Sequence, residues 1–191
     1  MIDDNFYQPE FYHFNEDSLE LSKLVLKELG ESEIETFLDA ACGCGIIGIE
    51  ILRNKSINET YFIEKQAEFL ESLEKNIQKY IPSRTSHIVI DEIQSFNREV
   101  KFDLITINPP YFNSKNSRPS PDVNKNTCRI FEETDLENIF RKLFKMLNAN
   151  GRMYFSFRKD EISIIEKIAV ENKRELNLVK DLNGAGLFRI V

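Results

Sequence analysis

The chain is organised around the stretch Phe37-Leu38-Asp39-Ala40-Ala41-Cys42-Gly43-Cys44-Gly45-Ile46-Ile47-Gly48. A short apolar run ends at Asp39, glycines follow at alternate positions, and an amphipathic run opens at Ile46, which predicts a strand, a tight turn and a helix. Without a Cβ, Gly43 and Gly45 can adopt positive φ and let a nucleoside lie against bare backbone, near the free N–H groups of the helix. The same pattern also occurs where a turn only joins a strand to a helix.

Acidic residues stand at the ends of three predicted strands. Asp39 lies at the carboxyl end of the first strand, where open α/β sheets hold their ligands. Glu64 ends the second strand about 20 residues beyond the glycine turn, where an acid can accept both hydroxyls of a ribose; the alternative is a solvated acid. The third strand ends at Asp91-Glu92. Either carboxylate can accept from an adenine amino group, and the sequence leaves open which one does so, or whether both are simply exposed.

The fourth predicted strand runs into Asn108-Pro109-Pro110-Tyr111-Phe112. Two prolines fix φ and remove two N–H donors, so this turn is rigid and rich in acceptors. The Asn108 side-chain oxygen and the Pro109 carbonyl can each take a hydrogen from a planar NH₂ group. Tyr111 can stack on a planar acceptor, and Phe112 can shield it from water. A diproline loop without chemistry is the alternative.

Charge is distributed unevenly along the 191 residues, whose formal net charge is −7. Residues 1–35 hold ten acidic and two basic residues, a net charge of −8, whereas residues 98–159 hold seven acidic and twelve basic residues, a net charge of +5. The second segment can therefore face phosphates, although charged runs are usually only solvated. Residues 113–131 lack apolar periodicity and carry basic side chains, so we interpret them as a substrate loop; these are Lys115, Arg118, Lys125 and Arg129.

Other features narrow the class of protein. No run of 18 apolar residues and no secretory signal appear, so we expect a soluble cytoplasmic protein without a membrane partner. Three cysteines, Cys42, Cys44 and Cys128, fit no disulfide framework and no common zinc spacing, so we expect no metal. His13 and His87 lack the context of a general base.

The remaining pattern predicts a single α/β domain, with an N-terminal arm and covering helix over residues 1–35 and a core over residues 36–191. Aromatic density predicts that residues 1–16, the N-terminal arm, are ordered, and Ser18 is predicted to cap a helix that covers the ligand end of the sheet. Predicted helices span 18–29, 46–54, 65–80, 134–150 and 160–172. After the first strand, which ends at Asp39, further strands are predicted at 60–64, 86–90, 102–107, 153–157, 176–180 and 187–191. Gly184 and Gly186 are predicted to form the last turn.

The glycine stretch resembles motif I of class I S-adenosylmethionine (SAM) dependent methyltransferases, and Asn108-Pro109-Pro110-Tyr111 resembles the turn of those that modify exocyclic adenine nitrogens or glutamine amides. Within this group the chain is most similar to the bacterial tRNA1(Val) N6-adenine methyltransferase family. The similarity is carried by Gln8-Pro9-Glu10-Phe11-Tyr12-His13-Phe14 with Asp17-Ser18-Leu19, by Gly45-Ile46-Ile47-Gly48, and by Phe112 with Asn126-Thr127-Cys128-Arg129 and Glu132-Glu133. The chain departs from this pattern at Phe11, His13 and Cys128, which stand where the family has glycine, arginine and alanine.

The resemblance implies a Rossmann-like α/β fold with a seven-stranded, mostly parallel sheet and helices on both faces, SAM as the methyl donor, and a tRNA adenine beside the anticodon as the acceptor. The implied catalytic residues are Asn108, Pro109, Pro110 and Tyr111. The implied cofactor contacts are Asp39, Ala41, Gly43, Gly45, Glu64, Asp91 and Asn108, and the implied substrate contacts are Tyr111, Phe112, Lys115, Arg118, Lys125 and Arg129. Alternatives are a glutamine methyltransferase of the release-factor type and a SAM-binding subunit that needs a partner. Oligomeric state is left open.

Overall fold

The computed structural model describes residues 6–14, 16–110, 112–113, 121–131 and 133–191. Its centre is a seven-stranded sheet of order β3-β2-β1-β4-β7-β9-β8, formed by β1 (Ile34–Ala40), β2 (Ile57–Glu64), β3 (Ser86–Ile90), β4 (Phe102–Ile107), β7 (Leu147–Arg158), β8 (Leu176–Asp181) and β9 (Ala185–Ile190). β1 to β4 and β7 pair in parallel, and β9 is antiparallel to β7 and β8. The predicted α/β fold is confirmed.

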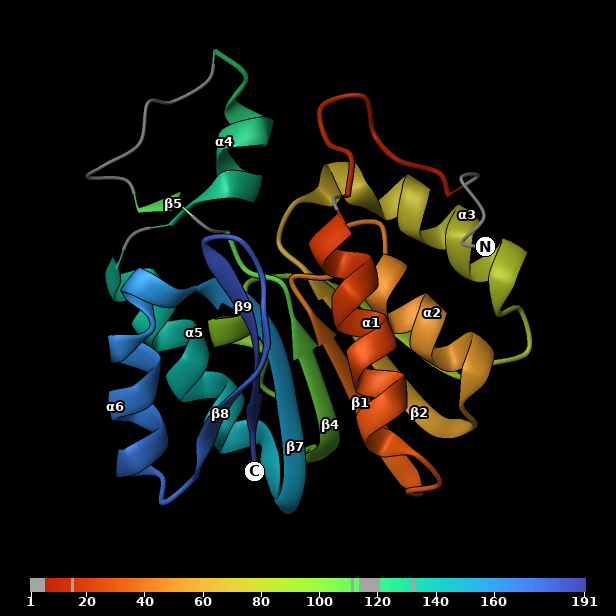
Figure 1. Ribbon diagram of the computed structural model, residues 1–191. Helices are drawn as coiled ribbons and strands as arrows, with labels where there is room; N and C mark the ends of the chain where they lie inside the picture. The colour runs from red at the N-terminus through yellow and green to blue at the C-terminus, as the bar shows by residue number, and fades with distance from the viewer. Residues whose placement is uncertain (1–5, 15, 111, 114–120, 132) are drawn as a thin grey trace.

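Helices cover both faces of this sheet (Figure 1). One face carries α1 (Glu16–Leu29), α2 (Ile46–Asn54) and α3 (Leu70–Tyr80), and the other carries α5 (Glu133–Met146) and α6 (Ser163–Glu171). Each face has its own apolar core, because successive strand residues point to opposite sides. Phe37 packs with α1 and α2, whereas the neighbouring Leu38 packs with α5 and α6. Among the described residues no helix is long and apolar enough to cross a membrane.

Several predicted boundaries are corrected. The second strand begins earlier, at Ile57, and the helix predicted from residue 65 starts with a 3₁₀ turn, η1 (Ala67–Phe69), before α3. Another 3₁₀ turn, η2 (Ile93–Ser95), follows β3, and the turn η4 (Lys159–Glu161) precedes α6. The helix predicted to reach residue 150 ends at Met146, and β7 runs through Asn150-Gly151.

Close packing requires glycine at two positions in the last quarter of the chain. A Cβ at Gly151 would lie 2.7 Å from the Phe102 carbonyl oxygen, so this strand residue passes close to neighbouring backbone. Gly186 belongs to β9 and not to the last turn, and a Cβ there would meet Leu178 at 2.5 Å. The turn is made by Asn183-Gly184, with Leu182 and Ala185 exchanging backbone hydrogen bonds across it.

The segment predicted as a loop over residues 113–131 contains regular structure. A short parallel pair, β5 (Phe112–Asn113) and β6 (Ile130–Phe131), flanks the helix α4 (Val123–Arg129). In Figure 1, α4 and β5 lie above the carboxyl ends of the sheet strands. Sequence periodicity missed it because α4 is two turns long and presents few apolar residues.

Candidate active site

A cavity lies at the carboxyl ends of β1, β2, β3 and β4. Tyr12 of the N-terminal arm and Thr127 and Cys128 of α4 also line it. Its lining includes seven residues that the sequence analysis places in a site or as the alternative to one: Ala41, Gly43, Glu64, Asp91, Glu92, Asn108 and Pro110. The edge of a parallel sheet where the strands end brings these residues together, although they come from four separate parts of the sequence.

Asp39 lies beneath the glycine turn and not in the cavity wall. The side chain is fully buried. One carboxylate oxygen accepts the backbone N–H of Gly48 at 2.8 Å, and the other accepts the hydroxyl of Thr106 at 2.7 Å. A Cβ at Gly48 would approach Asp39 Oδ2 to 2.8 Å, so only glycine lets α2 come this close to β1. Asp39 therefore ties α2 to β1 and β4 and shapes the turn from below.

The buried Asp39 carboxyl predicts a pH dependence of stability. Burial raises the pKa of Asp39 to about 7, against the opposing hydrogen bonds from Thr106 and Gly48. Between this value and the unfolded-chain pKa of about 3.9, the folded protein binds a proton that the unfolded chain has released, so the free energy of unfolding falls as pH rises. In the Asp39→Asn variant residue 39 does not titrate, so the variant should lack this fall in the free energy of unfolding. Urea unfolding from about pH 4 to about pH 8 should show wild type losing on the order of a few kcal/mol relative to the variant; parallel curves would contradict the assignment.

The two glycines of the turn have different roles. Both have positive φ, +53° at Gly43 and +83° at Gly45. Gly43 lines the cavity, together with Ala41, which also has positive φ. Gly45 lies behind the wall, where its N–H donates to the Cys42 carbonyl at 2.8 Å and a Cβ would meet Leu73 at 2.5 Å. The predicted bare backbone facing the cavity is therefore provided by Gly43.

Glu64 closes the wall at the end of β2. It is 5% exposed. One oxygen accepts the N–H of Gly43 and the other that of Gln66, each at 2.9 Å. Burial raises the pKa of this carboxyl, and these two hydrogen bonds act in the opposite direction. A carboxylate offers about four acceptor positions, so Glu64 can hold the turn and still accept from a ligand.

Asp91 and Glu92 both line the cavity, so the choice between them stays open. The backbone N–H of Asp91 donates to the Glu64 carbonyl at 3.0 Å, which fixes the chain after β3. Asp91 Oδ1 accepts the N–H of Glu92 at 2.7 Å. With Asp135, at the start of α5, the described residues of the cavity wall include four carboxylates and one cation, Lys65.

The Asn108-Pro109-Pro110 turn follows β4 and forms the opposite side of the cavity from β3. Asn108 and Pro110 line it, and Pro109 between them is buried. Asn108 Nδ2 donates to the hydroxyl of Ser18 at 2.9 Å. Tyr111 lies outside the described residues, and Phe112 is described only as the first residue of β5.

The structure describes two of the four basic residues that were predicted to contact the substrate. Lys115 and Arg118 lie outside the described residues. Lys125 is an exposed residue of α4 away from the cavity wall, and its N–H donates to Asp122 Oδ1 at 3.1 Å. Arg129 is the last residue of α4. Within the described parts of the chain, no group of three or more His, Cys, Asp or Glu residues could hold a metal ion.

Several wall residues were not predicted as site residues. Tyr12 comes from the N-terminal arm and packs edge-on against Phe69, with ring centroids 5.4 Å apart. Thr127 and Cys128 come from α4, and Cys128 Sγ accepts from Gln66 Nε2 at 3.0 Å. The aromatic density of the arm was a signal that it packs, but no sequence pattern indicated that it packs at the cavity.

Comparison with known proteins identifies the family. The model of the methyltransferase small domain matches residues 14–160, which include the whole glycine turn and the Asn108 turn. The chain belongs to this family. The prediction of a class I SAM-dependent methyltransferase is thereby confirmed. The matched residues include all elements from α1 to β7.

Two curated relatives share one name. A protein of Pedobacter heparinus named tRNA1(Val) (adenine(37)-N6)-methyltransferase is 26% identical over 128 residues, which are 66% of this chain and 53% of the relative. A protein of the same name from Pseudoalteromonas atlantica is 24% identical over 172 residues, 81% of this chain and 65% of that protein. The chain thus spans about half to two thirds of the length of these relatives.

A solved structure shares the fold. The ribosomal protein L11 methylase of Lactobacillus delbrueckii subsp. bulgaricus superimposes with a TM-score of 0.71 at 18% identity, covering 99% of this chain and 90% of that one.

Proposed function

We propose that this methyltransferase small domain transfers a methyl group from SAM to an exocyclic adenine N6 of RNA, with a tRNA1(Val) adenine beside the anticodon as the favoured acceptor. The observation that carries this proposal is the position of Asn108. Its side chain lies in the wall of the cavity that Gly43 and Glu64 also line. A donor held by the glycine turn and an acceptor amine held by Asn108 would therefore meet in one cavity.

The cavity suits SAM as a ligand. SAM is a nucleoside with a sulfonium cation and no phosphate, and the four carboxylates among the described wall residues favour a cation and disfavour a phosphate. Gly43 presents backbone without a Cβ, and Glu64 and Asp91 would accept from the ribose and the adenine. Gln66 Oε1 is a buried atom in the same wall that has no hydrogen-bond partner among the described residues. An orphaned acceptor of this kind is consistent with a polar ligand, because buried polar atoms are normally paired.

Bound SAM would supply an electrophilic methyl group, so this chain's residues need only position the acceptor. Adenine N6 is a weak nucleophile whose lone pair is delocalised into the ring. Asn108 Oδ1 and the Pro109 carbonyl would each accept one hydrogen of the NH₂ group and favour the partly cationic nitrogen that forms as the bond to carbon develops. Positioning of the amine and the preorganised acceptors would supply the rate enhancement. The surplus proton of the methylated amine would leave to water after the transfer.

The basic residues of the 113–131 segment support an RNA acceptor. The chain from residue 98 to residue 159 has a net charge of +5, and this segment includes α4, next to the cavity. Tyr111 and Phe112 follow the diproline directly, where a flipped base would need a stacking partner. The second candidate is methylation of a glutamine side-chain amide, because the Asn108 turn would suit that NH₂ group as well.

Transfer of labelled methyl from SAM to defined acceptors tests the proposal. Purified protein is incubated with bulk tRNA from a strain that lacks the gene, or with release factors, and each product is separated before counting. Label in tRNA, recovered as N6-methyladenosine by nucleoside mass spectrometry, is the expected result. Label in the release factor alone would favour the glutamine reaction, and SAM binding without transfer to either would favour a subunit that needs a partner.

A further inference from the structure

The side chain of Asn76, in α3, bonds to two segments that are distant from each other in the sequence. It is fully buried. Oδ1 accepts the backbone N–H of Tyr7 at 2.8 Å, and Nδ2 donates to the Tyr7 carbonyl at 2.9 Å. Nδ2 also donates to the carbonyl of Cys44 at 2.9 Å. A carboxamide has two N–H donors, so one is directed to the N-terminal arm and the other to the glycine turn.

Both of these segments reach the wall of the cavity. Cys44 directly follows Gly43, which lines the cavity, and the arm brings Tyr12 to it. Tyr12 packs edge-on against the ring of Phe69, and a Cβ at Gly43 would lie 3.5 Å from the same ring. Gly43 and Tyr12 therefore both lie against Phe69, and Asn76 connects the two pieces of chain that carry them.

The arm is folded into a compact turn. The N–H of Tyr12 donates to the carbonyl of Pro9 at 3.1 Å. The N–H of Phe14 donates to Gln8 Oε1 at 2.8 Å, which closes the turn from the side. Because these bonds join positions 8 to 14, a displacement of the neighbouring Tyr7 should displace Tyr12 as well.

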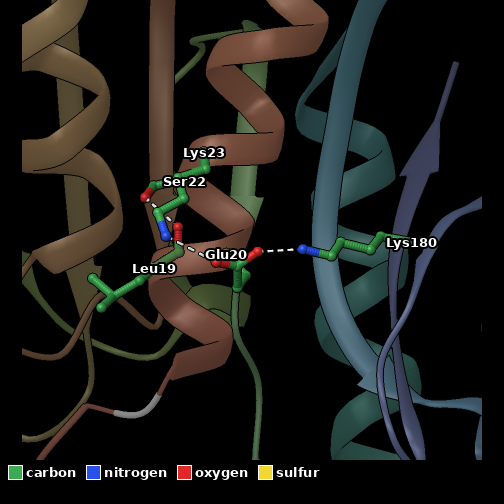
Figure 2. A network of polar contacts seen from close by, with 5 residues as sticks. All are labelled: Leu19, Glu20, Ser22, Lys23 and Lys180. Carbon is green, nitrogen blue, oxygen red and sulfur yellow. Dashed lines mark hydrogen bonds and ion pairs between the residues drawn. The ribbon is translucent and has the colours of Figure 1, made fainter.

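Beyond the arm the chain enters α1, which has its own contacts with the sheet. Ser18 was predicted to cap this helix, but α1 begins at Glu16. Glu20 pairs with Lys23 on the same helix and with Lys180 of β8, as Figure 2 shows. Loss of the contacts between the arm and α3 should therefore leave α1 in place.

We propose that Tyr12 contacts bound SAM and that Asn76 is a positioning residue, which holds the arm and the glycine turn together around the methyl donor. This inference rests on the cavity being the SAM site, as in the proposed function, and does not depend on the acceptor. An aromatic ring attracts a cation such as the sulfonium. Burial raises the pKa of Tyr12, so its hydroxyl keeps its proton and can donate to the carboxylate of SAM.

The first test asks whether Asn76 holds the arm, and it needs no ligand. Hydrogen exchange is followed by mass spectrometry in peptides that cover residues 6–14. Asn76→Ala should speed exchange at the Tyr7 N–H about ten-fold, because this group loses its acceptor. Gln78→Ala removes an exposed amide from the same helix and should leave exchange unchanged. Equal exchange in Asn76→Ala and wild type would overturn the proposal.

The second test measures Kd for SAM by calorimetry. Tyr7→Pro removes the N–H that Asn76 accepts and does not touch the bond from Asn76 to Cys44. Tyr7→Ala keeps this N–H and removes only the side chain. Asn76→Ala, Tyr7→Pro and Tyr12→Ala should each raise Kd about ten-fold, the usual worth of one interaction of this kind. Tyr7→Ala and Gln78→Ala should bind SAM as wild type does.

Combining Tyr7→Pro with Tyr12→Ala decides whether the arm acts through Tyr12. The double variant should bind SAM no more weakly than Tyr12→Ala alone, because the contact that the arm positions is already gone. Additive losses, or wild-type affinity in Tyr12→Ala, would overturn the proposal. If Asn76→Ala unfolds, the variants at positions 7 and 12 still decide, since they lie outside the sheet and its helices.

These measurements also separate this proposal from the proposed function. Wild type that binds SAM but transfers its methyl group to no RNA would overturn the proposed function, while the affinities still decide the role of Asn76. Wild type without affinity for SAM would overturn both.

Discussion

Replacing Asn108 by alanine should abolish most methyl transfer while leaving SAM binding almost intact. Asn108 lines the cavity, and its role in the proposed reaction is to accept from the nucleophilic NH₂ group. A preorganised acceptor in a buried site is worth about 10² to 10³ in kcat. Turnover with labelled SAM should therefore fall by about this factor, and Kd for SAM, measured by calorimetry, should change less than about three-fold.

Asn172→Ala provides the matched control for that variant. Asn172 is an amide at the end of α6, whose Nδ2 donates to the Ile168 carbonyl of the same helix at 2.8 Å. Its removal should leave both turnover and SAM affinity near wild type. If Asn108→Ala lost turnover and SAM affinity to the same extent, Asn108 would be a cofactor contact and not the acceptor for the amine.

Replacing Glu64 by glutamine should have the opposite signature, a large loss of SAM affinity. Glu64 accepts from the N–H groups of Gly43 and Gln66, so an amide must turn its NH₂ toward one of these two donors. The unpaired buried donor and the displaced glycine turn should each cost about 1 to 3 kcal/mol. Kd for SAM should rise about 100-fold, whereas turnover at saturating SAM should fall much less.

The control for Glu64→Gln lies on the same strand. Glu59 is partly exposed near the other end of β2, where it bonds with Tyr61 and His87. Glu59→Gln should bind SAM as wild type does. Unchanged SAM affinity in Glu64→Gln would contradict the assignment of this carboxylate to the cofactor site, and a matching loss in Glu59→Gln would point to general destabilisation of β2.

The site was predictable to the extent that it follows the ends of strands. Gly43, Glu64, Asp91 and Asn108 each come directly after an apolar run, and parallel strands bring such positions to one edge. Asp39 and Gly45 belong to the same motif but lie behind the wall, because residues on adjacent positions of a turn can face opposite sides. Tyr12 and Cys128 reach the cavity through long-range packing of the arm and α4, which leaves no periodic trace.

The sequence by itself determined the order of the elements, the α/β class and the position of the glycine turn, because alternating and helical hydrophobic patterns and the conformational freedom of glycine act locally. Only the tertiary structure decided what each polar group bonds to. The Asp39 carboxylate accepts from Gly48 and Thr106, and the Ser18 hydroxyl accepts from Asn108, 90 positions further along the chain. These partners are chosen by burial, since a polar group taken out of water must bond to whatever the packed chain brings within reach.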